Sequence, residues 1–129
     1  MAVLGIGIDL VEVERIRQLL EKHGERFRSK TFTQNEILYC DSCGNPAMHY
    51  AARFAAKEAV AKALGTGLWA KGVDWKDIEV TRNAEGRPAV TLTGGALERM
   101  RESGGAEVLI SLTHTADLAS AYALIQRLQ

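Results

Sequence analysis

The segment from Arg53 to Gly65 restricts the fold of this chain more than any other, because it reads as a helix with two unlike sides. On an ideal helix, with about 100° per residue, one half of the surface carries Arg53, Phe54, Lys57, Glu58, Lys62 and Gly65. The other half is small and apolar, and consists of Ala52, Ala55, Ala56, Ala59, Val60, Ala63 and Leu64. We therefore expect a helix over residues 47–64, ended by Gly65, that lies close against a core and holds a rigid charged face on its other side.

Hydrophobic periodicity and turn residues predict the remaining elements. The first half of the chain favours a strand at 2–9, a helix at 12–23 stopped by Gly24, and a short helix at 34–40 that begins with a capping box of Thr33 and Glu36. The second half favours strands at 78–81, 89–92, 108–112 and 119–125, with a helix at 95–102. Early helices followed by hairpin patterns indicate an α+β fold, and the length of 129 residues indicates one domain over residues 1–129.

The composition excludes several classes of protein. The formal net charge is zero, which argues against a general nucleic-acid-binding protein. The apolar runs are far shorter than a membrane span, so we expect no membrane partner. The apolar start of the chain has no preceding basic region and leads directly into Asp9, which does not resemble a signal peptide. We therefore expect a cytoplasmic protein.

Cys40 and Cys43 form a single C-x-x-C pair. A redox pair and half of a zinc site are both conceivable, but no second pair is present. We favour two thiols in or beside a loop.

Two carboxylates stand out as candidates for chemistry. Asp9 closes an apolar strand, where it either caps the helix that starts near residue 12 or binds a metal. Glu58 either forms a surface ion pair with Lys62, four residues later, or lies on a face that Phe54 helps to cover. Together, Asp9 and Glu58 would give Mg²⁺ two oxygen ligands, and phosphate and water would supply the rest.

Three further features carry a structural and a functional interpretation each. His114 lies where a strand enters a turn, and Arg87 and Pro88 lie at a hairpin tip. Cations on the first helix form either a solvated face or a docking ridge for an acidic partner, and they include Arg15, Lys22 and Arg26. Taken without any family, these features predict a site for Mg²⁺ and a phosphate ester, but they name no substrate.

Three motifs in order along the chain closely resemble the 4'-phosphopantetheinyl transferases of the short, bacterial holo-acyl-carrier-protein synthase type. They are GIGIDLVEV from Gly5 to Val13, RFAAKEAVAKALG from Arg53 to Gly65, and SLTHT from Ser111 to Thr115. The resemblance covers essentially the whole chain. It implies the fold of that family, an antiparallel sheet packed with a long helix, assembled as a homotrimer.

The resemblance also implies a reaction, in which 4'-phosphopantetheine moves from coenzyme A to a serine of apo-acyl carrier protein, for fatty acid biosynthesis. Asp9 and Glu58 would hold Mg²⁺, and Lys62 would bind phosphate and assist proton transfer. The serine hydroxyl would lose its proton to a carboxylate or to a metal-bound water. The residues that would bind coenzyme A are Arg53, Gly65, Arg87, Pro88, His114 and Thr115. Arg15, Lys22 and Arg26 would dock the carrier protein.

In this family each site lies between neighbouring chains, so Asp9 and His114 would come from one chain and the helix from Arg53 to Gly65 from the next. Two other hypotheses compete with the transferase. One is a hydrolase of phosphate esters that uses Asp9, Glu58 and Lys62, and the other is a non-catalytic module that binds coenzyme A or carrier protein.

Overall fold

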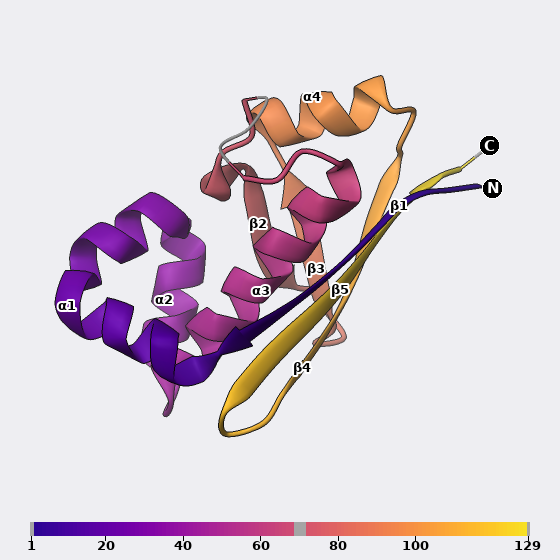
Figure 1. The fold of residues 1–129 in the computed structure, drawn as a ribbon. Helices are drawn as coiled ribbons and strands as arrows, with labels where there is room; N and C mark the ends of the chain where they lie inside the picture. Colours follow the sequence, from indigo (N-terminus) through magenta and orange to yellow (C-terminus); the bar gives the residue numbers. More distant parts are fainter. Residues whose placement is uncertain (1, 69–71, 129) are drawn as a thin grey trace.

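The computed structural model describes residues 2–68 and 72–128, which fold around one long helix, α3 (Pro46–Leu64). A three-stranded antiparallel sheet packs against α3 in the order β1-β5-β4 (Figure 1). Its strands are β1 (Ala2–Glu12), β5 (Leu118–Arg127) and β4 (Glu107–His114). A second sheet pairs β2 (Ile78–Arg82) with β3 (Pro88–Leu92), and α3 also contacts β2. The prediction of an α+β fold with an antiparallel sheet on a long helix is confirmed.

The other helices surround this centre. They are α1 (Val13–Thr31), α2 (Gln34–Ser42), the short 3₁₀ helix η1 (Trp75–Asp77), which the sequence did not predict, and α4 (Gly94–Glu102). The capping box of Thr33 and Glu36 begins α2 as predicted, and Gly65 ends α3 in the left-handed conformation, with φ of 78°. No helix in the described part of the chain is long and apolar enough to cross a lipid bilayer.

The small side of α3 brings β1 unusually close, as its alanines predict. A Cβ atom built on Gly7 would lie 1.9 Å from the carbonyl oxygen of Ala59, and one built on Gly5 would lie 2.0 Å from that of Ala63. Strand and helix therefore touch through their backbones. Asp9 follows Gly7 by two residues, so this contact holds Asp9 beside the last turns of α3.

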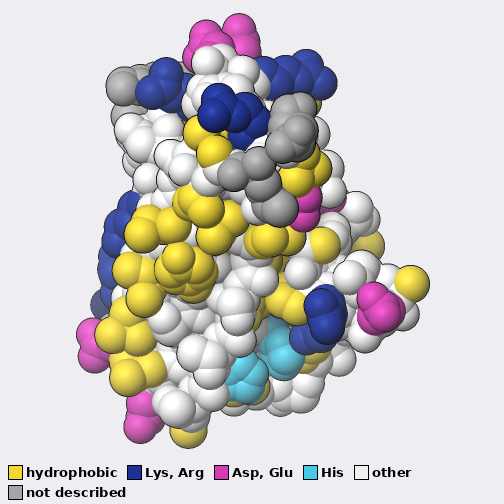
Figure 2. Space-filling model, turned by 90° about the vertical axis from the view of Figure 1, so that its right-hand side faces the viewer, with side chains coloured by type: hydrophobic (Ala, Val, Ile, Leu, Met, Phe, Trp, Pro, Cys, Tyr) yellow, Lys and Arg dark blue, Asp and Glu magenta, His cyan; other side chains and the backbone are white. Residues whose placement is uncertain are grey.

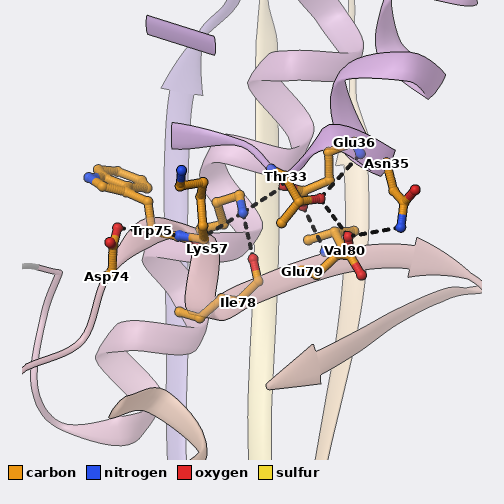
Figure 3. Close-up of polar contacts among 10 residues, drawn as sticks. Thr33, Asn35, Glu36, Lys57, Asp74, Trp75, Ile78, Glu79 and Val80 are labelled. Atoms are coloured by element: carbon orange, nitrogen blue, oxygen red, sulfur yellow. Dashed lines mark hydrogen bonds and ion pairs between the residues drawn. The ribbon is translucent and has the colours of Figure 1, made fainter. Parts of the chain in front are cut away.

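The prediction that α3 presents a charged face is wrong for two of its cations, Lys57 and Arg53, because both are buried. Lys57 is fully buried, and its Nζ atom lies 2.8 Å from Glu36 Oε1 of α2 (Figure 3). The same ammonium donates to the carbonyl oxygens of Trp75, at 3.0 Å, and Ile78, at 2.5 Å. Arg53 is only 4% exposed. The reason is that α2, η1 and β2 cover this side of the helix, so only Glu58 and Lys62 stay accessible.

Two predicted element ends are also wrong. The helix α1 continues beyond Gly24 to Thr31, with a kink at His23, where φ and ψ are −134° and 33°. Phe27 packs against Phe32 with ring centroids 5.5 Å apart, and such contacts outweigh the cost of about 1 kcal/mol for glycine in a helix. The strand β1 continues past Asp9 to Glu12 because its last residues pair with the start of β5.

The C-x-x-C pair lies where α2 runs into a loop, in agreement with the prediction of two thiols in or beside a loop. Cys40 is fully buried in α2, and Cys43 follows as the C-cap residue with its thiol donating to Tyr39 O at 3.3 Å. Both cysteines are free thiols. Burial raises the pKa of Cys40 to about 12, so this thiol stays protonated and unreactive at neutral pH.

Candidate functional site

Asp9, Glu58 and Lys62 meet within a single chain. Lys62 Nζ lies 3.3 Å from Asp9 Oδ1 and donates to the carbonyl oxygen of Ile8 at 2.9 Å. Glu58 lies one turn earlier on α3 and is close enough to Asp9 for the two charges to interact. The expectation that Asp9 and the helix come from different chains is therefore wrong, because the close contact of β1 with α3 joins them in one chain.

The structure does not support Asp9 as a helix cap or Glu58 as the ion-pair partner of Lys62. The N-cap of α1 is Glu12, not Asp9, because β1 continues to that residue. Within the described residues, Lys62 forms its ion pair with Asp9 rather than with Glu58. Asp9 and Glu58 lie close enough for their charges to interact, where β1 packs against α3.

The charges around Glu58 suit a cation. Burial raises the pKa of the Glu58 carboxyl, and the nearby Asp9 carboxylate raises it further, while Lys62 and Arg15 lower it. Two carboxylates that repel each other in a partly buried place gain stability when a divalent ion lies between them. The described residues offer no cluster of three or more possible metal ligands. Two carboxylate oxygens are nevertheless a normal protein share for Mg²⁺, which takes its remaining ligands from water and phosphate.

This site opens to solvent along β1, an edge strand of the sheet. The Lys62 side chain is 51% exposed, whereas that of Asp9 is 17% exposed. A shallow pocket of about 300 Å³ lies here, lined by Ile8, Asp9, Leu10, Lys62 and Ser120. A charged ligand can therefore reach the ammonium of Lys62 and the carboxylate of Asp9 from outside.

A second, cationic pocket lies toward the first half of α3. Arg53 and His114, predicted to bind the same ligand, line this pocket of about 170 Å³ together with Pro88. The Nε atom of Arg53 is buried and has no hydrogen-bond partner among residues 2–68 and 72–128. A buried, unpartnered guanidinium nitrogen in a pocket leaves a donor free for an anionic ligand.

Two residues of this pocket were missed by the sequence reasoning. His49 and Arg82 complete the lining, and the imidazole rings of His49 and His114 have centroids 6.4 Å apart. Burial lowers the pKa of His49, and the charge of Arg53 lowers it further. His49 precedes Arg53 by four residues on α3, and that spacing places both on one side of a helix. Arg82, like Arg87, flanks the hairpin tip, which was a second available signal.

The remaining predicted ligands of coenzyme A lie in different settings. Pro88 and the exposed Arg87 also line a groove of about 460 Å³ between β3 and β4. The Thr115 hydroxyl accepts hydrogen bonds from the backbone N–H groups of Asp117 and Leu118, so it stabilises the β4–β5 turn. Gly65 ends α3, beyond Lys62. The structure thus gives Thr115 and Gly65 clear structural roles.

The predicted docking residues are exposed but do not share one straight helix. Arg15, Lys22 and Arg26 all reach solvent, and Arg15 is close enough to Glu58 to influence its pKa. The kink at His23 separates Lys22 from Arg26, and Figure 1 shows the two halves of α1 turned relative to each other.

Known proteins resemble this chain over almost its full length. Residues 5–122 match the 4'-phosphopantetheinyl transferase superfamily. The chain is 46% identical to holo-[acyl-carrier-protein] synthase of Methylobacterium radiotolerans, over 98% of this chain and 95% of the relative. It is 48% identical to the enzyme of the same name from Sinorhizobium fredii, over 98% and 93% of the two chains.

Solved structures give the same result. The crystal structure of the holo-[acyl-carrier-protein] synthase from Neisseria meningitidis superposes with a TM-score of 0.89 at 32% identity, over 98% of this chain and 100% of that one. The Helicobacter pylori enzyme in complex with coenzyme A superposes with a TM-score of 0.82 at 28% identity, over 94% of this chain and 99% of that one.

Proposed function

The chain belongs to the holo-[acyl-carrier-protein] synthases of the 4'-phosphopantetheinyl transferase superfamily, and we propose how its own residues perform the reaction of that family. It transfers 4'-phosphopantetheine from coenzyme A to a serine of apo-acyl carrier protein, for fatty acid biosynthesis. The serine Oγ atom forms a bond to the phosphorus that carries the pantetheine arm. The bond from that phosphorus to the bridging pyrophosphate oxygen breaks, and adenosine 3',5'-bisphosphate leaves.

The observation that supports the site assignment best is the convergence of Asp9, Glu58 and Lys62 from two distant segments of the chain. The family generally uses Mg²⁺, and the Asp9 and Glu58 carboxylates would hold it. When bound, the ion supplies positive charge at the pyrophosphate.

The residues of the chain itself supply the remaining steps. The half-exposed ammonium of Lys62 binds a phosphate oxygen and stabilises the charge that develops there. The serine hydroxyl has to lose its proton during the attack. A carboxylate of the site or a water held by the bound ion would take this proton.

The cationic pocket would bind a second part of coenzyme A. Arg53, His114 and Pro88 line it, and the buried Nε atom of Arg53 has no hydrogen-bond partner in the part of the chain that the structure describes. A phosphate group of coenzyme A would supply that partner. Arg87 would contact the same ligand from the adjoining groove, and Gly65 and Thr115 remain proposed contacts on the strength of the family motifs.

We further propose a homotrimer with its sites between neighbouring chains. The outer face of the three-stranded sheet supports association, since Ile6, Ile8 and Leu10 are 59%, 62% and 63% exposed. Figure 2 shows hydrophobic side chains gathered in a band on this side of the molecule. Ile8 and Leu10 also line the pocket beside Asp9, so a neighbour that covered them would enclose the site.

Light scattering tests this assembly. Ile8→Lys places a charge in the apolar face and is expected to reduce the assembly to smaller species. Leu38→Lys changes an equally exposed leucine on α2 and is the matched control, with no expected change in mass. A wild-type protein that is monomeric at working concentrations would contradict the proposal.

The exposed Arg15, Lys22 and Arg26 would attract the acidic surface of a carrier protein. Arg15 lies close to Glu58, so a carrier protein bound at Arg15 would place its serine near the site. We propose that residues 1–129 act as one domain and that the reaction takes place in the cytoplasm, as the sequence suggests.

Substitution of the carboxylates tests the metal assignment. Asp9→Asn and Glu58→Gln are expected to reduce Mg²⁺-dependent transfer by at least about 100-fold, a loss of about 2.7 kcal/mol of transition-state stabilisation. Glu102→Gln removes an exposed carboxylate on α4 and is expected to keep full activity. Full activity of either site variant would contradict the assignment.

A further inference from the structure

Two guanidinium groups contact one tyrosine beside the cationic pocket. The Cζ atom of Arg53 lies 4.4 Å from the centroid of the Tyr39 ring, and that of Arg82 lies 5.5 Å from it. The Nε atom of Arg82 also donates to the Tyr39 hydroxyl at 3.1 Å. Tyr39 comes from α2, Arg53 from α3 and Arg82 from the end of β2, so this side chain joins three elements.

This arrangement costs electrostatic free energy, because it places two positive charges beside one pocket. Arg53 and Arg82 are both permanently charged and both line the same pocket, so they repel each other. In residues 2–68 and 72–128, no carboxylate forms a salt bridge with either guanidinium. The electron-rich face of an aromatic ring attracts a guanidinium, and it does so without supplying the negative charge that an anionic ligand would bring.

We propose that Tyr39 is a positioning residue, whose ring and hydroxyl hold Arg53 and Arg82 at the pocket so that both guanidinium groups contact one phosphate of coenzyme A. The inference rests on the proposed function, because it assumes that this pocket receives the phosphate. Tyr39 itself does not line the pocket, so it acts through the two arginines.

The geometry explains why a tyrosine suits this place. A guanidinium binds a phosphate well only when its planar fork is already oriented, because ordering a long side chain costs conformational entropy. The ring holds Arg53 by its face, whereas the hydroxyl holds Arg82 by a hydrogen bond. A second bond, from Arg82 Nη1 to the carbonyl oxygen of Gly86 at 2.9 Å, ties the same guanidinium to the hairpin tip.

Two variants separate these contacts. Tyr39→Phe keeps the ring under Arg53 and removes only the hydrogen bond to Arg82, so KM for coenzyme A is expected to rise about threefold. Tyr39→Leu removes both contacts, and the expected rise is about tenfold, or about 1.4 kcal/mol. In both variants kcat is expected to stay within about twofold, because Glu58 and Lys62 are unaffected.

A matched control exists elsewhere in the chain. Arg28 meets Tyr50 in the same way, with Nε donating to the hydroxyl at 3.1 Å and Cζ 5.5 Å from the ring centroid. Neither residue lines the cationic pocket. Tyr50→Phe is therefore expected to lower stability without raising KM for coenzyme A.

Direct binding measures the pocket without any transfer. Adenosine 3',5'-bisphosphate is titrated by calorimetry into wild type, Tyr39→Leu and Tyr50→Phe, and about tenfold weaker binding is expected for Tyr39→Leu alone. Adenosine 5'-monophosphate distinguishes which phosphate is held. If the leucine variant binds the monophosphate as well as wild type does, the pocket holds the 3'-phosphate; an equal loss assigns the other phosphate.

The proposal is overturned if Tyr39→Leu binds the bisphosphate as tightly as wild type, or if Tyr50→Phe weakens binding to the same extent. It is also overturned if wild type does not bind the bisphosphate. A wild-type protein that binds the bisphosphate but transfers nothing would contradict the proposed function and leave the role of Tyr39 supported by the binding difference.

Discussion

Replacement of Lys57 by methionine tests whether this lysine serves the fold or a ligand. Its ammonium is fully buried between Glu36 of α2 and two backbone carbonyls, so it joins α3 to α2, η1 and β2 (Figure 3). Methionine keeps most of the volume and removes the charge. The Glu36 carboxylate then remains buried with only the backbone N–H groups of Thr33 and Val80, each 2.8 Å away.

The expected loss of stability follows from this unpaired charge. Removal of one partner of a buried ion pair costs about 3 to 5 kcal/mol. The entropy of unfolding is about 2.1 cal/mol/K per residue, or about 0.27 kcal/mol/K for a chain of this length. The midpoint of thermal unfolding should therefore fall by about 10 to 20 °C.

Circular dichroism measures this midpoint, with all variants at one protein concentration because assembly shifts it. Lys62→Met is the matched control, since Lys62 lies on the same helix but is half exposed. Lys62→Met is expected to shift the midpoint by less than about 3 °C while activity falls. A Lys57→Met protein with an unchanged midpoint and a raised KM for coenzyme A would refute this reasoning.

Three further predictions concern packing and thiol chemistry. Gly7→Ala places a methyl group 1.9 Å from the carbonyl oxygen of Ala59, so β1 has to move away from α3, and both the unfolding midpoint and kcat are expected to fall. In the control Gly44→Ala, the methyl group meets nothing within 4 Å, so neither quantity should change. Equal behaviour of the two variants would contradict the role of the close contact. In the folded protein at neutral pH, iodoacetamide is expected to modify Cys43 and spare Cys40, as mass spectrometry of peptides would reveal. Because burial raises the folded pKa of Cys40 from 9.0 to about 12, its contribution to stability is full below pH 9 and is lost as the pH rises toward 12. The alkaline fall in the unfolding midpoint should therefore be smaller in Cys40→Ala, and an unchanged alkaline fall would contradict it.

The sequence predicts those parts of the fold that depend on local pattern. The capping box at Thr33, the left-handed Gly65 and the two hairpins follow from residue type and spacing, and all four are present. The apolar side of α3 was also readable, because alanine repeats at helical spacing leave few alternatives. Asp9 and Glu58 were paired only by the family resemblance and their shared chemistry, since they lie far apart in sequence.

The errors arise where distant segments decide burial. A helical projection places Lys57 beside Glu58, but it cannot reveal that α2 brings the Glu36 carboxylate over that position. The same limit hid the cationic pocket, because Tyr39, His49 and Arg82 come from three elements. The end of the first helix was missed for a similar reason, since contacts of Phe27 with Phe32 and Phe54 hold the turns beyond Gly24.

The most direct test of the central claim is the mass of an apo-acyl carrier protein after incubation with coenzyme A, Mg²⁺ and this chain. A gain of one phosphopantetheine unit is expected with wild type and none with Glu58→Gln. Coenzyme A is expected to stay intact when the carrier protein is omitted. An unchanged carrier mass with wild type, or rapid cleavage of coenzyme A without carrier protein, would contradict the assignment of Asp9, Glu58 and Lys62 as a transferase site.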